Sequence, residues 1–439
     1  MSVNITVPRR ICTAVLNSLS AGVVPRTGLE YIAIGRTREI AAFLEDLQTV
    51  EDGGSAFRLI TGRYGSGKSF LLQLLRGHAL ERGFAVADCD LSPERRLTGA
   101  KGQGLATYRE LARNLSCRAA PDGGGLPVIL TRWIASLQIA QAKEHGYTPG
   151  SPELAQAVEV AILDAVTRFS GMVHGFDFAA AVTAFYRGMA GGDEPLKQAA
   201  LRWLRGEYTT KTEAKKDLPV SDIISDESWY DYVKLLSSLM VETGQKGLIV
   251  LIDEAVNLYK IVQSVARESN YEKLLGIFND ATQGRLSHLA FFFGGTPQFV
   301  EDTRRGLYSY EALRSRLRAN RFAEGDIQDY AGPVLTLQPL TPEELLALLQ
   351  RVRILHAQRY DWTPPVSDEQ LAAFVTDAAS RMGADVMLTP REVVRDFTGL
   401  LNLLQQNPEA GFESLVKTVD FAPADSRAEV EEDFASFTL

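Results

Sequence analysis

The sequence contains little cysteine and little histidine. Its 439 residues include three cysteines, at Cys12, Cys89 and Cys117, and five histidines. Three widely spaced cysteines do not support a disulfide framework, and neither residue type occurs at the spacing of a zinc site. We therefore expect a reduced, cytoplasmic setting and no zinc-dependent chemistry.

Long apolar runs are also absent. No stretch of about 18 apolar residues indicates a membrane span, and residues 1–10 lack the basic-then-apolar order of a signal peptide. Hydrophobic residues make up 45% of the chain and charged residues 23%, which is an ordinary balance for a globular protein. We expect no membrane association, and the length predicts two or three packed units.

Basic residues are outnumbered by acidic ones, and the formal net charge is −9. This balance argues against a surface that is basic throughout. A local basic groove can nevertheless coexist with acidic faces, so contact with nucleic acid stays open.

One glycine-rich segment, residues 62–69, carries the most functional information. It fits the pattern G-x-x-x-x-G-K-[ST], which cradles the phosphates of a nucleoside triphosphate. Residues 57–61 before it predict a short buried strand, and residues 70–75 after it predict a helix with an apolar face. The predicted nucleotide-binding residues of this segment are Gly62, Arg63, Tyr64, Gly65, Ser66, Gly67, Lys68, Ser69 and Phe70.

Each part of this loop has a chemical role. The glycines allow backbone N–H groups to turn toward the phosphate oxygens. Lys68 is expected to reach the outer phosphates, and Ser69 offers a hydroxyl to Mg²⁺. The following helix directs its positive N-terminus at the same anion. The segment therefore predicts binding of ATP and Mg²⁺.

Two acidic residues follow a continuous apolar strand that is predicted at residues 248–252. Asp253 could hold Mg²⁺, and Glu254 could polarise the attacking water. Such a pair is common by chance, but after a phosphate loop it is a specific signal. The alternative is an acidic pair at a helix N-terminus.

Downstream polar residues could complete the site. Thr296 follows the strand predicted at residues 289–293 and could sense the γ-phosphate, or simply cap a helix. Arg314, Arg316 and Arg318 alternate along the chain and cannot share one helical face. We expect Arg316 to act as an arginine finger toward a neighbouring subunit, with the other two as competing candidates.

A second helix start is predicted at Thr389 and Pro390, which places Arg391 in the first turn. An arginine gains little from the helix dipole at that end. This position favours a functional role, such as contact with the β- and γ-phosphates from a lid.

The sequence between Lys68 and Asp253 is much longer than the roughly 30 residues of a strand–helix–strand unit, so it predicts an insertion. Further strands are expected at residues 84–90 and 334–337, and residues 101–243 are mostly helical by pattern. Helices are predicted at residues 108–117, 130–143, 153–169, 177–189 and 196–205. Thr341 and Pro342 predict the start of another helical region.

These motifs occur in an order that resembles the AAA+ ATPases, especially the origin-recognition and initiator branch. Residues 34–39 look like the motif that packs near adenine there, which implicates Gly35 and Arg36. The resemblance covers about residues 31–420 and implies roles for Lys68 and Ser69 (phosphate loop), Asp253 and Glu254 (Walker B), Thr296 (sensor 1), Arg316 (finger) and Arg391 (sensor 2).

The implied fold class is α/β, with a P-loop AAA+ parallel sheet flanked by helices, a large helical insertion and a C-terminal helical lid. The expected organisation is an N-terminal helix and linker at 1–34, an ATPase core at 35–340 including the insertion at 101–243, a lid at 341–420 and an acidic tail at 421–439.

A closer resemblance lies in residues 90–97, 108–115 and 200–207, which are similar to segments of the ATP-binding proteins of bacterial BREX phage-defence islands. Related proteins occur in other defence islands, so the system stays open. The resemblance implies ATP hydrolysis in a homo-oligomer or an assembly with other defence proteins. The alternative is a nucleotide-dependent switch or scaffold with little turnover. DNA binding is a third hypothesis, based on Arg304, Arg305, Arg314, Arg318 and Arg321.

Overall fold

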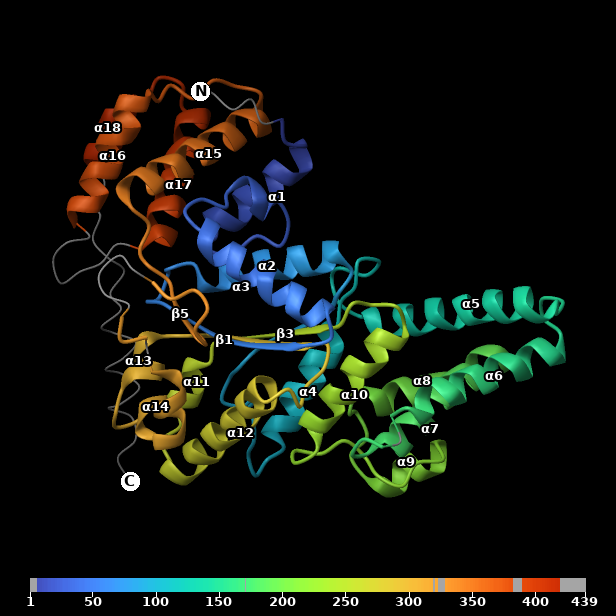
Figure 1. The fold of residues 1–439 in the computed structure, drawn as a ribbon. Helices are drawn as coiled ribbons and strands as arrows, with labels where there is room; N and C mark the ends of the chain where they lie inside the picture. Colours follow the sequence, from blue (N-terminus) through green and yellow to red (C-terminus); the bar gives the residue numbers. More distant parts are fainter. Residues whose placement is uncertain (1–5, 170, 319, 323–327, 382–388, 419–439) are drawn as a thin grey trace. The chain divides into compact units, whose positions relative to one another are not determined.

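The structure is a computed structural model (Figure 1) that describes residues 6–169, 171–318, 320–322, 328–381 and 389–418. The chain forms two compact units. The larger consists of residues 38–61 and 75–336, and the smaller of the residues up to 37, residues 62–74 and the residues from 337 onward. The predicted acidic tail at 421–439 lies outside the described residues.

The larger unit is built on a parallel sheet. Its strands run in the order β2-β3-β4-β1-β5, and every neighbouring pair is parallel. The predicted α/β fold with a parallel sheet flanked by helices is therefore confirmed. The strands are β1 (Ser55–Thr61), β2 (Ala85–Asp90), β3 (Leu248–Asp253), β4 (Leu289–Gly295) and β5 (Val334–Thr336).

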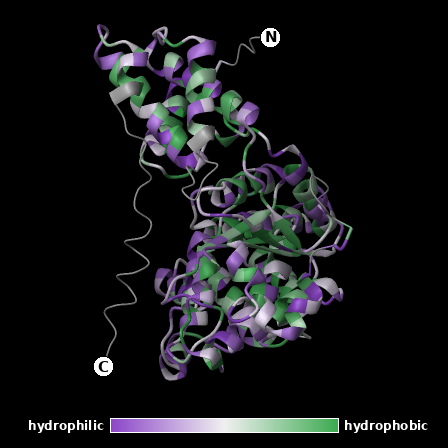
Figure 2. Ribbon diagram, turned by 90° about the vertical axis from the view of Figure 1, so that its left-hand side faces the viewer, coloured by the Kyte–Doolittle hydropathy of each residue, from purple (hydrophilic) through white to green (hydrophobic). Residues whose placement is uncertain are grey.

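Helices cover both faces of this sheet (Figure 1). Successive side chains of a strand point to opposite faces, and β4 shows the consequence. Phe292 meets Phe43 of α2 edge-on at 5.5 Å between ring centroids, whereas Phe291 lies 6.0 Å from Tyr230 of α10. Strands buried on both sides must be apolar throughout, and Figure 2 shows them as hydrophobic. The covering helices are α2 (Thr37–Glu51), α3 (Lys68–Arg82), α4 (Gln103–Asn114), α10 (Trp229–Glu242) and α12 (Ser264–Thr282).

The insertion begins by protecting a sheet edge. β2 is an edge strand, and such strands present unpaired backbone groups. Ser116 and Val86 exchange two backbone hydrogen bonds, of 3.0 and 2.7 Å, in an antiparallel bridge. The segment after α4 therefore covers part of the β2 edge.

The insertion is helical, as its pattern predicts. The five predicted helices correspond to α4, α5 (Gly125–His145), α6 (Pro152–Thr167), α7 (Gly175–Gly191) and α8 (Glu194–Leu204). Two more helices, α9 (Lys211–Asp217) and α10, were not predicted. Eight of the nine buried residues of α10 are apolar or aromatic, and they do not form a single helical stripe, because this helix is enclosed by both the insertion and the sheet.

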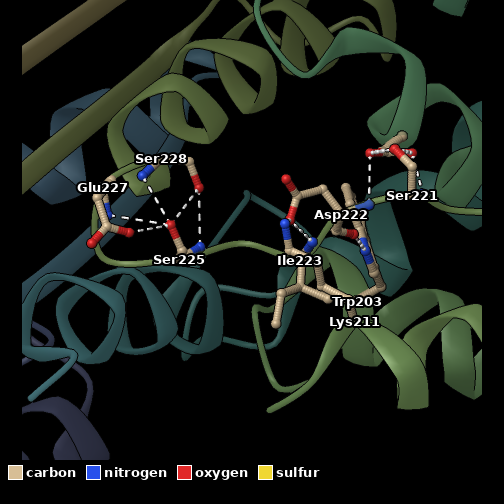
Figure 3. Close-up of polar contacts among 9 residues, drawn as sticks. Trp203, Lys211, Ser221, Asp222, Ile223, Ser225, Glu227 and Ser228 are labelled. Atoms are coloured by element: carbon tan, nitrogen blue, oxygen red, sulfur yellow. Dashed lines mark hydrogen bonds and ion pairs between the residues drawn. The ribbon is translucent and has the colours of Figure 1, made fainter.

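Polar contacts fasten the segment that leads from α9 to α10 (Figure 3). The buried carboxylate of Asp177 accepts hydrogen bonds from the backbone N–H groups of Ser221 at 2.7 Å and Asp222 at 3.0 Å. The indole of Trp203 donates to the Asp222 carbonyl, and Lys211 pairs with the Asp222 carboxylate, both at 2.9 Å. These bonds satisfy backbone groups that would otherwise be buried unpaired.

The smaller unit contains a helical bundle. Its core includes Val15, Leu349 and Phe397, all fully buried. Thr341 and Thr389 each form a capping box at the start of a helix, which confirms both predicted helix starts. The helices are α1 (Arg9–Ser20), α15 (Pro342–Tyr360), α16 (Asp368–Arg381), α17 (Pro390–Gln406) and α18 (Phe412–Thr418).

The length and apolar character that a membrane crossing requires are not found in any helix of the described ranges.

One buried ion pair offers a test of the packing between α2 and β1. Arg58 is 7% exposed and donates to both carboxylate oxygens of Asp46 at 2.8 Å. Replacing Asp46 by alanine leaves a buried guanidinium without its counter-charge. We expect Asp46→Ala to lower the free energy of unfolding by about 3 kcal/mol, measured by urea denaturation followed by circular dichroism.

The control for this measurement is Glu159→Ala. Glu159 pairs with Arg187, whose side chain is 56% exposed, and exposed pairs contribute about 0–1 kcal/mol. Equal losses in the two variants would contradict a special role for the Asp46–Arg58 pair.

Candidate nucleotide site

The phosphate loop, residues 62–69, is a tight turn that the chain enters directly from the end of β1. The backbone N–H of Ser66 donates to the Arg63 carbonyl at 3.1 Å. Gly65 and Gly67 have φ angles of +75° and +95°, which side chains other than hydrogen strongly disfavour. The Lys68 ammonium donates to the carbonyls of Gly62 at 2.9 Å and Arg63 at 2.8 Å. Loop and lysine thus form one compact structure.

Close approaches explain why two positions in this loop are glycine. A Cβ atom on Gly62 would lie 2.4 Å from the Ser66 hydroxyl, and one on Gly65 would lie 2.5 Å from Cβ of Thr389. The Ser66 hydroxyl is itself buried and has no hydrogen-bond partner among the described residues. This orphaned group and the positive N-terminal end of α3 fit an anionic ligand.

The N-terminal segment contacts the same loop. Arg36 is 6% exposed and donates to the Ser66 carbonyl at 3.1 Å. Gly35 has a φ of +73°, and a Cβ there would lie 2.6 Å from the carboxyl carbon of Glu344. Of the two predicted adenine-side residues, Arg36 therefore contacts the phosphate loop and Gly35 lies against α15.

Arg391, the predicted sensor, also lies on the phosphate loop. Its guanidinium donates to the Tyr64 hydroxyl at 3.0 Å and lies 5.0 Å from the centre of the Tyr64 ring. Tyr64 itself is 71% exposed. The start of α17 thus contacts the loop through Thr389 and Arg391, although Arg391 and Tyr64 are 327 residues apart in the sequence. A Lys or Arg stacked on an aromatic ring in this way gains about 0.5–1 kcal/mol at an exposed site.

The acidic pair lies at the carboxyl end of β3, in the larger unit. Asp253 is the last residue of the strand, and Glu254 follows it with a φ of +56°. This left-handed conformation is uncommon for a residue other than glycine, and such strain is typical of functional positions. The backbone N–H of Glu254 donates to the Asp253 carboxylate at 2.8 Å.

A third carboxylate, Asp90, was not predicted. It ends β2 and is in register with Asp253 on the neighbouring strand. Burial, followed by the negative charges of Asp253 and Glu254, raises the pKa of Asp90 to about 6. The available sequence signal was an acidic residue at the end of the apolar strand predicted at 84–90.

These residues fit a magnesium ion that is held together with a nucleotide. No group of three or more potential ligands of the His, Cys, Asp and Glu types forms a cage within the described ranges. Mg²⁺ in nucleotide sites usually takes one or two carboxylates plus phosphate oxygens and water. The crowded negative charge of Asp90, Asp253 and Glu254 is the electrostatic setting that such a cation would neutralise.

Thr296 caps a helix. Its hydroxyl oxygen accepts a hydrogen bond of 3.2 Å from the backbone N–H of Phe299, at the start of α13 (Pro297–Glu301). The hydroxyl proton is not used by this bond, so the cap leaves a donor for a phosphate or a water molecule.

The three candidate finger arginines differ in their contacts. Arg316 of α14 (Glu311–Leu317) donates to the Asn279 side chain at 3.1 Å and to the Ala312 carbonyl at 2.8 Å. Arg314 lies 3.7 Å from the Glu311 carboxylate. Arg318 follows the helix and is exposed. Within the described ranges, Arg316 is the one of the three whose side chain is oriented by two hydrogen bonds.

Comparison with known proteins gives one family. The model of the family described as BREX system ATP-binding protein BrxC/D matches residues 7–420. No curated protein matches the chain. The match includes the phosphate loop, the acidic pair and the whole insertion.

The Asp90 carboxyl predicts a pH-dependent stability. Its pKa is about 6 in the folded protein against 3.8 as the ordinary value, so the folded state binds the proton more tightly. The stability that this proton contributes is present in full below about pH 4 and is lost as the pH rises through 6. Asp90→Asn should therefore be more stable than the wild type at pH 8 and equally stable at pH 4.

The expected gain at pH 8 is about 1 kcal/mol, because the Asp90 carboxyl is only partly desolvated and solvent screens its charge. Urea denaturation at both pH values in the presence of EDTA measures it, with the exposed loop residue Asp122→Asn as the control. A gain of the same size at pH 4 would show that Asp90 acts through packing and not through its charge.

Proposed function

We propose that this chain, which belongs to the BREX system ATP-binding protein BrxC/D family, is a Mg²⁺-dependent ATPase that works in a cytoplasmic assembly of phage-defence proteins. The observation that carries the proposal is Glu254. It occupies a strained backbone conformation directly after Asp253 at the carboxyl end of β3. A switch that only binds ATP needs no such residue, whereas hydrolysis needs a carboxylate that is held rigidly beside its water.

The phosphates would be bound by the loop. Lys68 and the backbone N–H groups of residues 65–69 supply positive charge and hydrogen bonds. The Ser66 hydroxyl, buried without a partner among the described residues, would gain one from a phosphate oxygen. Gly35 and Arg36 would border the adenine side.

The acidic residues would serve hydrolysis. Ser69 and Asp253 would hold Mg²⁺, and this ion would neutralise charge on the phosphates. Glu254 would accept a proton from the attacking water, and Thr296 would orient that water or the γ-phosphate through its remaining proton. The loop and the acidic pair would act on the same nucleotide, because the loop continues directly from β1, and β1 and β3 end at the same edge of the parallel sheet.

Two arginines would stabilise the negative charge that develops during hydrolysis. Arg391 would act within the same chain by leaving Tyr64 for the phosphates. Arg316 would act on the nucleotide of a neighbouring copy or of another defence protein. The ATP site would then be complete only in the assembly.

A second function, that of a nucleotide-dependent switch with little turnover, is favoured by one set of contacts. Thr389 packs on Gly65 and Arg391 stacks on Tyr64, so a change in the phosphate loop would move the start of α17. Such a link would let ATP control the shape that the lid presents to partner proteins or DNA.

Glu254→Gln tests the hydrolysis proposal. The amide cannot accept the proton, so we expect phosphate release to fall by a factor of about 10²–10⁴. ATP affinity should change little. Steady-state phosphate release and the binding of a fluorescent ATP analogue measure the two quantities.

Glu301→Gln, an exposed glutamate on α13, is the matched control and should leave both quantities unchanged. Wild-type turnover in Glu254→Gln would contradict the assigned role. Binding of ATP without phosphate release by the wild type, with and without DNA, would support the switch instead.

Mixing two inactive variants tests the shared site. Lys68→Ala should lose ATP binding, and Arg316→Ala should retain binding but lose turnover by a factor of about 10³ or more. A mixture forms some sites with ATP on one variant and the finger from the other, so phosphate release should recover in part. Arg314→Ala and Arg318→Ala are the controls and should remain active alone. A mixture no more active than its components would contradict a finger at Arg316.

A further inference from the structure

Three arginines outside the nucleotide site have a buried nitrogen without a partner. The Nε atoms of Arg96, Arg267 and Arg305 are inaccessible to solvent and form no hydrogen bond within the part of the chain that the structure describes. None of the three pairs with a carboxylate there. Buried cations are normally paired, because removing a charge from water is costly. An anion bound beside these groups would therefore be attracted by their uncompensated charge.

Arg267 and Arg305 lie against the same carbonyl group. Arg267, which is 8% exposed, donates to the oxygen of Ile261 at 2.8 Å, and Arg305 donates to the same oxygen at 3.3 Å. Arg305 is half-buried and lies 5.4 Å from the centre of the Tyr259 ring. A carbonyl and a ring carry only partial negative charge, so two full positive charges remain side by side.

The acidic side chain of the same turn, Asp302, is bonded to other groups. Asp302 accepts hydrogen bonds from the Tyr259 hydroxyl at 2.8 Å and from the backbone N–H groups of Arg304 at 2.7 Å and Arg305 at 3.2 Å. Glu268 and Glu301 on the flanking helices are exposed, whereas Lys260 and Arg304 add two exposed positive charges. The local charge is therefore positive on a chain whose net charge is −9.

Exposed apolar side chains lie in the same segment. Residues 260–263 connect α11 (Val256–Tyr259) to α12, and Val262 and Val265 are 85% and 76% exposed. Two arginines donate to backbone carbonyls of this segment and fix its position, while its valines face solvent. Exposed apolar side chains on a fixed segment indicate a contact surface.

We propose that residues 260–265, with Arg305 and Arg304 beside them, bind the phosphodiester backbone of nucleic acid. Guanidinium groups match phosphate geometry. Several cations in a row match a ligand whose negative charges repeat along its length. Arg305 makes the contact, and Arg267 adds charge from the interior. Of the residues predicted for DNA binding, the surface includes Arg304 and Arg305.

The segment that carries Arg96 is attached to the same helix as Arg267. The backbone N–H groups of Leu97 and Thr98 donate to the side chain of Asn270 at 2.9 and 3.1 Å. Asn270 lies one helical turn from Arg267 on α12. The segment that carries Arg96 is thus bonded to the helix that carries Arg267.

The test uses the full chain without nucleotide and labelled oligonucleotides in fluorescence anisotropy over a range of NaCl concentrations. Arg305→Gln should weaken binding about 5–20-fold and lower the slope of log K against log salt by about 1. Val262→Glu should also weaken binding, because it places a carboxylate beside the two arginines. Duplex DNA, single-stranded DNA and RNA are compared to identify the form that binds.

Val173→Glu and Arg187→Gln are the matched controls. Val173 is 63% exposed and lies in the insertion, and Arg187 is the exposed arginine paired with Glu159. Neither should change affinity or salt slope. If Arg305→Gln does not fold, Val262→Glu decides, since Val262 is exposed.

Undetectable binding by the wild type, or an unchanged affinity in both test variants, would overturn the proposal. Polyglutamate is also added at the same concentration of negative charge and the same ionic strength. If it displaces the oligonucleotide, the nucleic-acid proposal is overturned in favour of an acidic protein partner. Because binding is measured without ATP, its failure would leave the ATPase proposal standing.

Discussion

The parallel register of the sheet is the constraint on which the rest of the larger unit depends. Thr61 is paired with Gly295, and Asp90 with Asp253, so the carboxyl ends of β1, β2, β3 and β4 share one edge. The register is held by aromatic side chains that alternate between the two faces of β4. A shift by one residue would turn Phe292 away from α2 and expose the wrong face of every strand to its helices. The chemistry at the edge is therefore positioned by packing at the centre.

The phosphate loop depends on a second set of close contacts. Arg36 bonds to Ser66, and Thr389 packs on Gly65, so segments from both ends of the chain touch a loop of eight residues. These contacts require glycine where a side chain would collide. They also make the loop sensitive to the start of α17, so a nucleotide bound at the loop would be linked to this helix.

Two clusters of like charge stand out in the larger unit. Asp90, Asp253 and Glu254 concentrate negative charge, and Arg267 and Arg305 concentrate positive charge. The Arg58–Asp46 pair shows how this protein neutralises a buried charge from within. These two clusters of like charge are therefore the places where ligands of opposite charge would gain most, a cation at the first and a polyanion at the second.

The sequence by itself predicted the α/β class, the five strands, most of the insertion helices and the capped starts of α15 and α17, because these depend on local spacing and turn chemistry. The phosphate loop and the acidic pair could be found because their residues are close together in the chain. Only the tertiary structure decided that Asp90 stands beside Asp253, that Arg391 lies on Tyr64, and that Arg267 and Arg305 share one carbonyl. It also revealed the helix at residues 229–242. This helix is enclosed on most sides, so it lacks the amphipathic pattern by which helices are predicted. These features arise from strand register and from contacts between distant segments, which no local pattern records.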